Sequence, residues 1–226
     1  MSKPIFQDWG LIEYSKALDQ QLELVEILAQ KASDQNEDSP HPGFIIFCTH
    51  PPVVTTGRQT KPEDILDWAG DRIDISRGGR ATYHGPSQIV VYPILNLKQI
   101  RQGRQPQEVR GYLRALETAL IETLKKYEIT ATGKTRQKLS EEQIESDETG
   151  VWVGAQKIAS LGIAIKKWIT YHGMAINLDH DPEAYKGIRP CGFSSSVMTS
   201  VEQLLNKKVS REEFCKNLLQ NLNAHL

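Results

Sequence analysis

The chain has 226 residues, which is enough for one large domain or two small ones with a sizeable core. Its formal charge of -1 lacks the basic excess typical of nucleic-acid binders, and no apolar run is long enough to span a membrane. Because the N-terminus also lacks an apolar secretory stretch, we expect a cytoplasmic protein with neither nucleic acid nor membrane as a partner.

The first half of the chain mixes helical and strand patterns. Apolar residues at helical spacing predict a helix from Leu11 to about Lys31. The polar residues 33–42 are interrupted by prolines and predict an exposed insertion. The apolar run from Gly43 to Cys48 is typical of a buried strand, which Pro51 and Pro52 end.

The segment RGGRATYHGPSQ, residues 77–88, lies between predicted strands at Arg72–Ser76 and Ile89–Leu95. A hairpin needs about two to five connecting residues, usually with one glycine. This connection contains three glycines, two arginines, a tyrosine and a histidine, which is more than a turn between two strands requires. It lacks the Gly-x-Gly-x-x-Gly pattern and does not run into a helix, which argues against a dinucleotide site.

The second half of the chain is richer in strands. Pro106 is predicted to begin a helix that extends to about Tyr127. Residues 134–149 are highly charged without an apolar face, which predicts an exposed insertion. Alternating apolar residues predict strands between Gly150 and Leu178. A short helix is expected around Val201–Leu205, followed by a final helix capped by Ser210. Grouped strands with helices before, between and after them favour an α+β fold in a single domain, residues 1–226.

Cys191 is the cysteine best placed for chemistry. Pro190 fixes the chain before it, and Gly192 allows close backbone approach after it, as at a nucleophile whose oxyanion is held by backbone N–H groups. It is also compatible with a small buried residue on a turn. Cys48 and Cys215 follow apolar patterns and are predicted to be core residues. The odd number of cysteines suits a reducing compartment.

A cysteine nucleophile needs a group that accepts its proton. His84 and His172 are candidates, although buried histidines often only form structural hydrogen bonds. Lys157 is the other candidate, since an ammonium beside a thiolate would stabilise it. Metal binding is disfavoured, because the six histidines show no paired ligand spacing and no Cys-x-x-Cys occurs.

Five motifs, taken in order, resemble lipoate-protein octanoyltransferases. They are His50-Pro51-Pro52 with Thr56-Gly57-Arg58, RGGRATYHGP, GVWVGAQKIASLGI, Tyr171 to Asn177, and Pro190-Cys191-Gly192. The resemblance covers roughly residues 44 to 204. It implies a mixed β-sheet flanked by helices, similar to the catalytic domain of biotin and lipoate ligases.

The same resemblance implies the activity and the partners. Members of this family move an octanoyl group from acyl carrier protein to a lysine of lipoyl domains, in 2-oxoacid dehydrogenase E2 subunits and in glycine cleavage H protein. No ATP, metal or other cofactor is expected. The family's catalytic cysteine falls on Cys191 and its lysine on Lys157.

Three segments correspond to the family's acyl-binding residues. They are Arg77, Gly78, Gly79, Arg80, Ala81, Thr82, Tyr83 and His84; Ser160, Leu161 and Gly162; and Gly173, Met174 and Ala175. The glycines are expected to let the backbone lie against an extended acyl chain, with Tyr83 and the methyl of Thr82 as apolar wall and His84 as a polar fixed point near the reacting thioester. Ser87 departs from the glycine usual in the family, which puts the fit of the acyl chain in doubt.

Three other functions remain open from the sequence. An ATP-dependent lipoate or biotin ligase on the same scaffold would activate a free acid and need no cysteine. A non-catalytic module would bind acyl carrier protein or lipoyl domains without transfer. A cysteine hydrolase using His84 or His172 would lose its acyl group to water as fast as to lysine.

Overall fold

The computed structural model describes residues 2–33, 41–99, 104–135 and 148–226. The two expected insertions, 33–42 and 134–149, therefore lie largely outside the described residues. The helices of the described part are α1 (Tyr14–Ser33), α2 (Val109–Lys125), α3 (Val201–Leu205) and α4 (Arg211–His225), with short 3₁₀ turns at Pro62–Asp64, Pro190–Gly192 and Ser195–Val197. The strands are β1 (Ile5–Leu11), β2 (Phe44–Thr49), β3 (Val53–Thr56), β4 (Asp71–Asp74), β5 (Thr82–His84), β6 (Gln88–Ile94), β7 (Thr132–Gly133), β8 (Gly150–Val153), β9 (Gln156–Lys166) and β10 (Ile169–Asn177).

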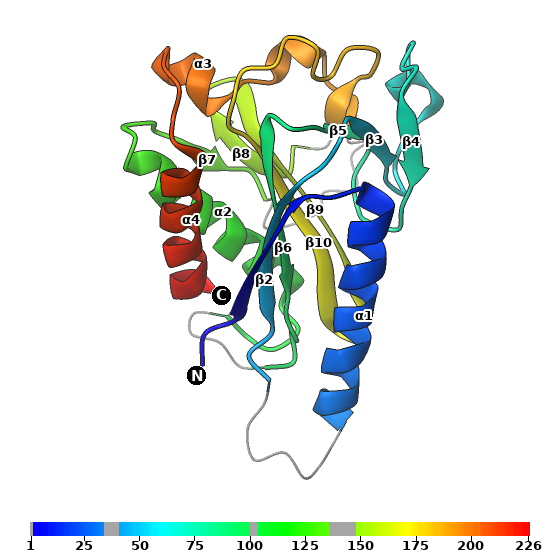
Figure 1. The fold of residues 1–226 in the computed structure, drawn as a ribbon, viewed down its shortest axis with the longest axis vertical. Coiled ribbons are helices and arrows are strands. Elements are labelled where there is room, and N and C mark those ends of the chain that lie inside the picture. The colour runs from blue at the N-terminus through cyan, green and yellow to red at the C-terminus, as the bar shows by residue number, and fades with distance from the viewer. Residues whose placement is uncertain (1, 34–40, 100–103, 136–147) are drawn as a thin grey trace.

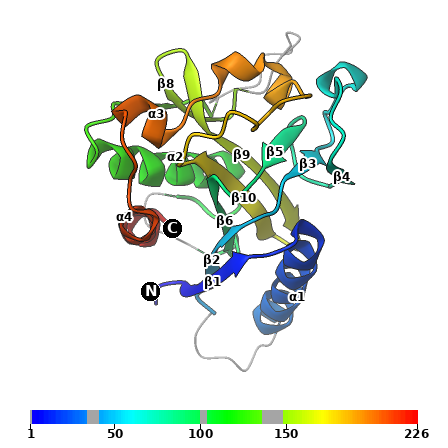
Figure 2. The same cartoon turned by 45° about the horizontal axis from the view of Figure 1, so that its top comes forward.

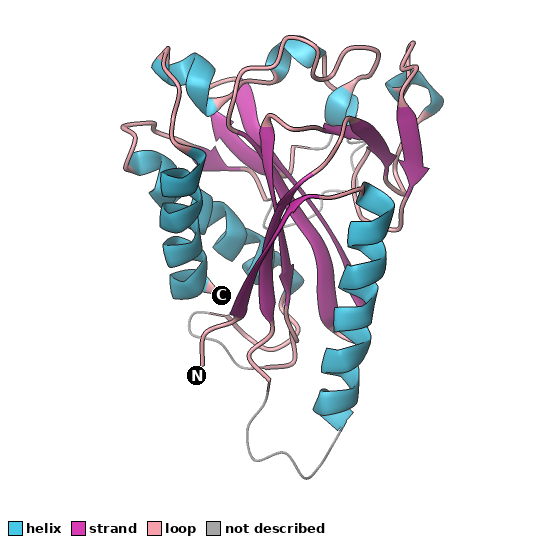
Figure 3. Cartoon of the chain, in the orientation of Figure 1, coloured by secondary structure: helices cyan, strands magenta, loops and turns pink. Residues whose placement is uncertain are grey.

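A mixed seven-stranded sheet forms the centre of the molecule, in the order β1-β2-β6-β10-β9-β8-β7 (Figure 1). Strands β1 and β2 run parallel, and the other neighbours run antiparallel. Helix α1 covers one face, and α2 and α4 cover the other (Figures 1 and 3). The predicted α+β class, a mixed sheet flanked by helices, is confirmed.

Strand β2 shows why the sheet needs helices on both faces. Phe44, Ile46 and Cys48 pack in the core beneath α1, whereas Ile45 and Phe47 pack in the core beneath α2 and α4. Successive side chains of a strand point to opposite faces, so a continuous apolar run is stable only when both faces are covered. The predicted burial of Cys48 is confirmed, and Cys215 is half-buried against the second of these cores.

A small second sheet, in the order β4-β3-β5, lies beyond the first turn of α1 (Figure 2). Residues 71–74 and 88–94 thus belong to different sheets, and the segment between them contributes a strand of its own, β5. Residues 77–88 are not a simple connection between neighbouring strands. They join the two sheets.

Two predicted helix starts differ from the structure. The chain from Ile5 to Leu11 is a strand parallel to β2, and α1 begins at Tyr14. Helix α2 begins at Val109, three residues after Pro106. The final helix agrees with its prediction, since the Ser210 hydroxyl accepts a hydrogen bond from the Glu213 amide at 3.3 Å. Among the described residues, no helix is long and apolar enough to cross a membrane.

Candidate active site

Cys191 occupies a backbone conformation that few residues adopt. Its φ of 55° lies in the left-handed region, inside the 3₁₀ turn Pro190–Gly192, and its side chain is buried. Such a conformation costs free energy for a residue with a Cβ and persists only where the surroundings fix it. The Ser160 hydroxyl of β9 lies 3.7 Å from Cys191 Sγ, within reach of a hydrogen bond to sulfur.

The backbone amides around Cys191 already have acceptors. The Cys191 amide donates to the Ala81 carbonyl at 2.8 Å, and those of Gly192 and Phe193 donate to Arg189 and Pro190, each at 3.0 Å. The sequence-based expectation that amides near Cys191 hold an oxyanion is therefore not met by these three in the structure. The Ala81 bond instead ties the cysteine to the segment 77–84.

A buried ion pair between Arg80 and Asp64 packs against the turn that carries Cys191. Arg80 Nε donates to Asp64 Oδ2 at 2.9 Å and its Nη2 to Oδ1, and Asp64 raises the pKa of the Arg80 guanidinium. The Asp64 carbonyl also accepts the Arg189 amide at 2.8 Å. A Cβ on Gly192 would lie 2.3 Å from Arg80 Nη1, so the guanidinium fills the space beside the turn. Nothing in the sequence indicated that Asp64 belongs to this site.

Lys157 is fully buried in β9. Its Nζ lies 5.8 Å from the ring centre of Phe193, two residues after the cysteine, and 5.6 Å from that of Trp152. The two aromatic rings and the burial restrict the position of this side chain. The structure thus brings the predicted lysine beside the loop that carries the predicted cysteine.

A β-bulge decides which way Lys157 points. Val151 pairs with Ala159 but Trp152 pairs with Lys157, so Ile158 is an extra residue on β9. Ile158 and Ala159 both pack in the core beneath α2 and α4. In a regular strand Lys157 and Ser160, three residues apart, would point to opposite faces; the bulge places them on the same face. The regular alternation predicted for this strand is therefore wrong next to Lys157.

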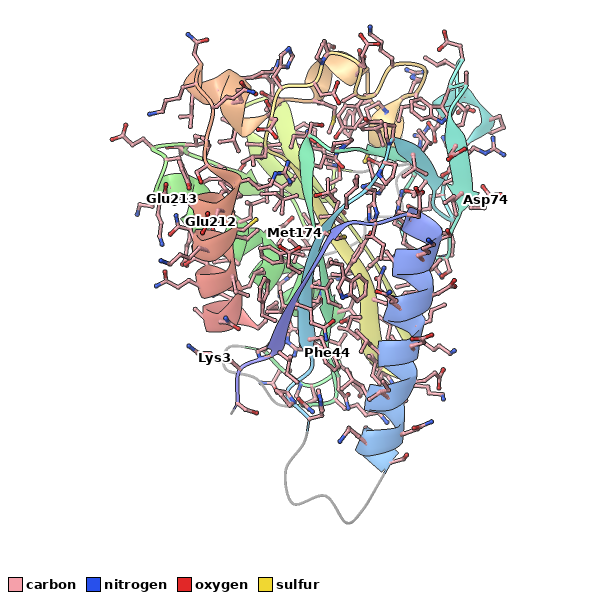
Figure 4. All side chains as sticks on the ribbon, in the orientation of Figure 1. Lys3, Phe44, Asp74, Met174, Glu212 and Glu213 are labelled. Atoms are coloured by element: carbon pink, nitrogen blue, oxygen red, sulfur yellow. The ribbon has the colours of Figure 1, made fainter. Side chains whose placement is uncertain are left out.

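A small pocket of about 30 Å³, partly open to solvent, extends from Cys191 over β9 and β10. Met174, which lies near the centre of the molecule in Figure 4, is part of its wall. The predicted residues on this wall are Arg77, Thr82, His84, Ser160, Leu161, Gly162, Gly173, Met174, Ala175 and Cys191.

Other predicted residues lie outside the pocket wall. Thr82 and His84 face the pocket, whereas Tyr83, between them on β5, packs edge-on against Trp68 and Tyr185 in a separate apolar cluster. Tyr83 does not supply the wall that the sequence predicted, because alternate residues of a strand face opposite sides. Gly85 is required by Tyr83, whose hydroxyl would lie 2.1 Å from a Cβ at that position.

The rest of segment 77–84 supports the site indirectly. Gly78 donates its amide to the Ile163 carbonyl, and Gly79 has a φ of 83°. Arg80 and Ala81 contact the Cys191 turn as described above. Ser87 also lies away from the pocket, with its hydroxyl 3.3 Å from Asp181.

The pocket includes four residues that sequence reasoning did not assign to it: Tyr14, Val90, Tyr92 and His172. His172 was considered only as a proton acceptor. Burial lowers its pKa to about 3 and also lowers the pKa of His84, so both imidazoles are neutral in the physiological range. Tyr14 belongs to the apolar stripe of α1, so its position in the sequence predicted a buried helix face and no function.

Comparison with known proteins identifies the family. The model of the lipoyl protein ligase A/B catalytic domain matches residues 18–223. An octanoyltransferase of Bdellovibrio bacteriovorus is 50% identical over 223 residues, which cover 98% of both chains. The chain belongs to the octanoyltransferase family. An octanoyltransferase of Cytophaga hutchinsonii is 37% identical over 97% of this chain and 91% of its own length. The predicted family and enzyme class, an acyltransferase, are confirmed.

Solved structures show that this octanoyltransferase has a fold similar to that of lipoate ligases. A putative lipoate protein ligase from T. acidophilum with bound lipoic acid has a TM-score of 0.69 at 16% identity, covering 100% of this chain and 85% of that one. A lipoate-protein ligase A bound with ATP has a TM-score of 0.67 at 16% identity, with the same coverage. At this identity the likeness concerns the fold alone, and the predicted similarity to the lipoate ligase domain is confirmed at that level.

Proposed function

We propose that this octanoyltransferase works through a thioester on Cys191, taking the octanoyl group from acyl carrier protein and passing it to a lysine of a lipoyl domain. The observation that supports the proposal is the position of Cys191, which lines the pocket, while the buried Lys157 lies 5.8 Å from the ring of Phe193, two residues after the cysteine. The whole chain, residues 1–226, acts as one catalytic domain.

In the first step the carrier's thioester is exchanged for the enzyme's. Lys157 takes the proton of the Cys191 thiol, and the thiolate attacks the octanoyl carbonyl carbon. The bond from that carbon to the phosphopantetheine sulfur breaks, and the departing thiolate receives the proton from Lys157. Because one thioester replaces another, the step is nearly isoenergetic and needs no ATP.

In the second step the acyl group leaves as an amide. The amine of the target lysine attacks the Cys191 thioester, Lys157 accepts a proton from that amine, and Cys191 departs as a thiolate that is then reprotonated. Amide formation from a thioester is downhill. Ser160, 3.7 Å from Sγ, is placed to donate a hydrogen bond to the thiolate in both steps.

The pocket would hold the acyl chain over β9 and β10. Gly162 and Gly173 pair with each other across the two strands and leave the sheet surface without side chains at that row. Burial of about seven chain carbons, at roughly 0.8 kcal/mol each, contributes on the order of 5 kcal/mol to binding.

The test is the intact mass of the protein after mixing with octanoyl carrier protein in the absence of ATP. We expect a gain of one octanoyl unit, no gain in Cys191→Ser, and loss of the unit when a lipoyl domain is added. Cys215→Ser, a change at a half-buried cysteine of α4, is the matched control and should load like the wild type. Modification of the lipoyl domain only with octanoate and ATP would make the chain a ligase.

Release of the acyl group to water as fast as to the lipoyl domain would indicate a cysteine hydrolase instead. Binding of either partner without any mass gain would indicate a non-catalytic module. Each rival function therefore predicts a different outcome of the same experiment.

A further inference from the structure

The acyl pocket has a defined far end. On the β9–β10 ladder Ser160, beside Cys191, pairs with Ala175, whereas Ile163 pairs with His172. These two rows are three residues apart, or about 10 Å at roughly 3.3 Å per residue. His172 therefore marks the end of the pocket that is remote from the reacting sulfur, at a separation comparable to an extended eight-carbon chain.

Aromatic and imidazole rings close this far end. The Tyr14 ring stacks on His84 at 5.6 Å and on His172 at 6.5 Å between centroids, and its hydroxyl lies 3.3 Å from His172 Nδ1. His50 packs 5.0 Å from Tyr14 and lies 2.7 Å from the Tyr92 hydroxyl through Nε2. The first turn of α1 thus covers the end of the pocket.

The backbone at His172 has an irregular conformation, and the imidazole lines the pocket. Its φ of 58° lies in the left-handed region in the middle of β10, and the β10–β6 register begins only at Met174. The His172 amide donates instead to the side chain of Gln21 on α1, at 2.8 Å. A strained residue inside a strand persists only where its surroundings enforce it, which suggests a functional constraint.

Two atoms of this end wall are unusual for a hydrocarbon site, because His84 Nδ1 and His172 Nε2 are both buried without a hydrogen-bond partner among the described residues. His172 is 2% exposed and lines the pocket. An unpaired buried polar atom destabilises the protein, whereas an apolar side chain at the end of a hydrocarbon pocket would not.

We propose that His172, supported by Tyr14 and His84, is the chain-length stop of the acyl pocket. A chain that ends short of Nε2 leaves space for a water molecule to bond that nitrogen. Two further methylenes occupy the space and leave the nitrogen without a partner. The inference rests on the proposed function, because it assumes that the acyl chain occupies this pocket.

The test compares acyl carrier proteins loaded with eight- and ten-carbon chains. In His172→Asn, which shortens the side chain and tolerates a positive φ, we expect the ratio of decanoyl to octanoyl kcat/KM to rise at least tenfold over the wild type. His84→Val, a smaller residue with high strand propensity, should shift the ratio in the same direction. His180→Asn is the matched control on an exposed histidine and should leave the ratio unchanged.

Folded variants with an unchanged ratio would overturn the inference. The wild type provides a second test that needs no variant, because an equimolar mixture of eight-, ten- and twelve-carbon carriers should load octanoyl at least tenfold in excess. Equal loading of all three chains would show that no stop exists. If the wild type loads none of them, the proposed function fails, a result distinct from failure of the length stop alone.

Discussion

At the scale of single residues, the two proposed reactive groups lie at backbone irregularities. Cys191 lies at a positive φ and Lys157 lies beside a β-bulge, so neither side chain would have its present direction in regular structure. Both irregularities are held by specific contacts: the Cys191 amide bonds Ala81, and the chain after Lys157 pairs in shifted register with β8. We therefore expect activity to be sensitive to changes in these contacts and not only in the two reactive side chains.

Lys157 gives the sharpest prediction at this scale. Lys157→Met keeps much of the volume of the side chain but removes the proton acceptor, so octanoyl transfer should fall by about 10²–10⁴-fold. Lys157→Arg should fall comparably, because a guanidinium stays protonated and cannot act as a base. The measurement is single-turnover acylation of Cys191 followed by intact mass. Lys207→Met, on an exposed lysine, is the control; near-normal acylation in Lys157→Met would remove the lysine from the chemistry.

The sequence indicated candidate reactive residues but not the residues that surround them. Cys191 and Lys157 were named through the motifs that resemble octanoyltransferases, and their catalytic roles stay predictions. Tyr14 and Asp64 could not be named in this way, because each reaches the site through tertiary packing from an element with no such motif. The assignment of Tyr83 was wrong for a local reason: the short strand β5 alternates its side chains, and the motif was interpreted as if all its residues faced one ligand.

At the scale of elements, the Asp64–Arg80 pair joins three separate segments. Asp64 ends the 3₁₀ turn before β4, Arg80 precedes β5, and both contact the turn that carries Cys191. Asp64 is fully buried and Arg80 nearly so. Removal of one partner leaves the other charge buried and unpaired, which is far more costly than the loss of an exposed ion pair.

Asp64→Ala should therefore lower the free energy of unfolding by about 3–5 kcal/mol. Glu63→Ala, at the exposed neighbouring carboxylate, should change it by less than about 1 kcal/mol. Urea unfolding at neutral pH measures both values. Folded Asp64→Ala should also acylate Cys191 more slowly, because the turn loses its support. Equal stability of the two variants would show that solvent or another group compensates Arg80.

Helices and strands with long apolar or alternating patterns were predicted correctly. Strands that are defined by their pairing with other strands were missed. The buried strands β2 and β6, the long hairpin β9–β10 and the capped helix α4 follow from apolar runs, alternation and a capping residue. Strand β1 was missed because Ile5 to Leu11 is an edge strand with exposed apolar residues, and only its pairing with β2 defines it. The small sheet β4-β3-β5 was missed because its short strands pair out of sequence order.

At the scale of the whole molecule, α1 connects the pocket to the sheet that carries it. Its first turn supplies Tyr14 to the far end of the pocket, and its apolar face packs along β10. Near its other end, Glu26 bonds Lys166 at 2.7 Å and Lys167 at 2.8 Å, at the turn between β9 and β10. One helix therefore fixes both the pocket end and the hairpin that forms the pocket wall.

This arrangement predicts a pH-dependent contribution to stability. The two lysines lower the pKa of Glu26 to about 2, below its value of roughly 4.3 in an unfolded chain. A carboxylate with a depressed pKa stabilises the fold above the unfolded pKa and loses that contribution as the pH falls toward about 2. The difference in melting temperature between wild type and Glu26→Gln should therefore be present at pH 7 and shrink steadily below pH 4.

Because Glu26 is partly exposed, the same difference should also shrink in 1 M salt, which screens surface charges. Glu23→Gln, one turn earlier on the exposed side of α1, is the control and should show neither dependence. A Glu26→Gln effect that does not change with pH or salt would mean that the side chain packs against the hairpin without electrostatic attraction. In that case the apolar face of α1 alone would hold Tyr14 over the pocket, and Glu26→Gln would leave the acyl-length preference unchanged.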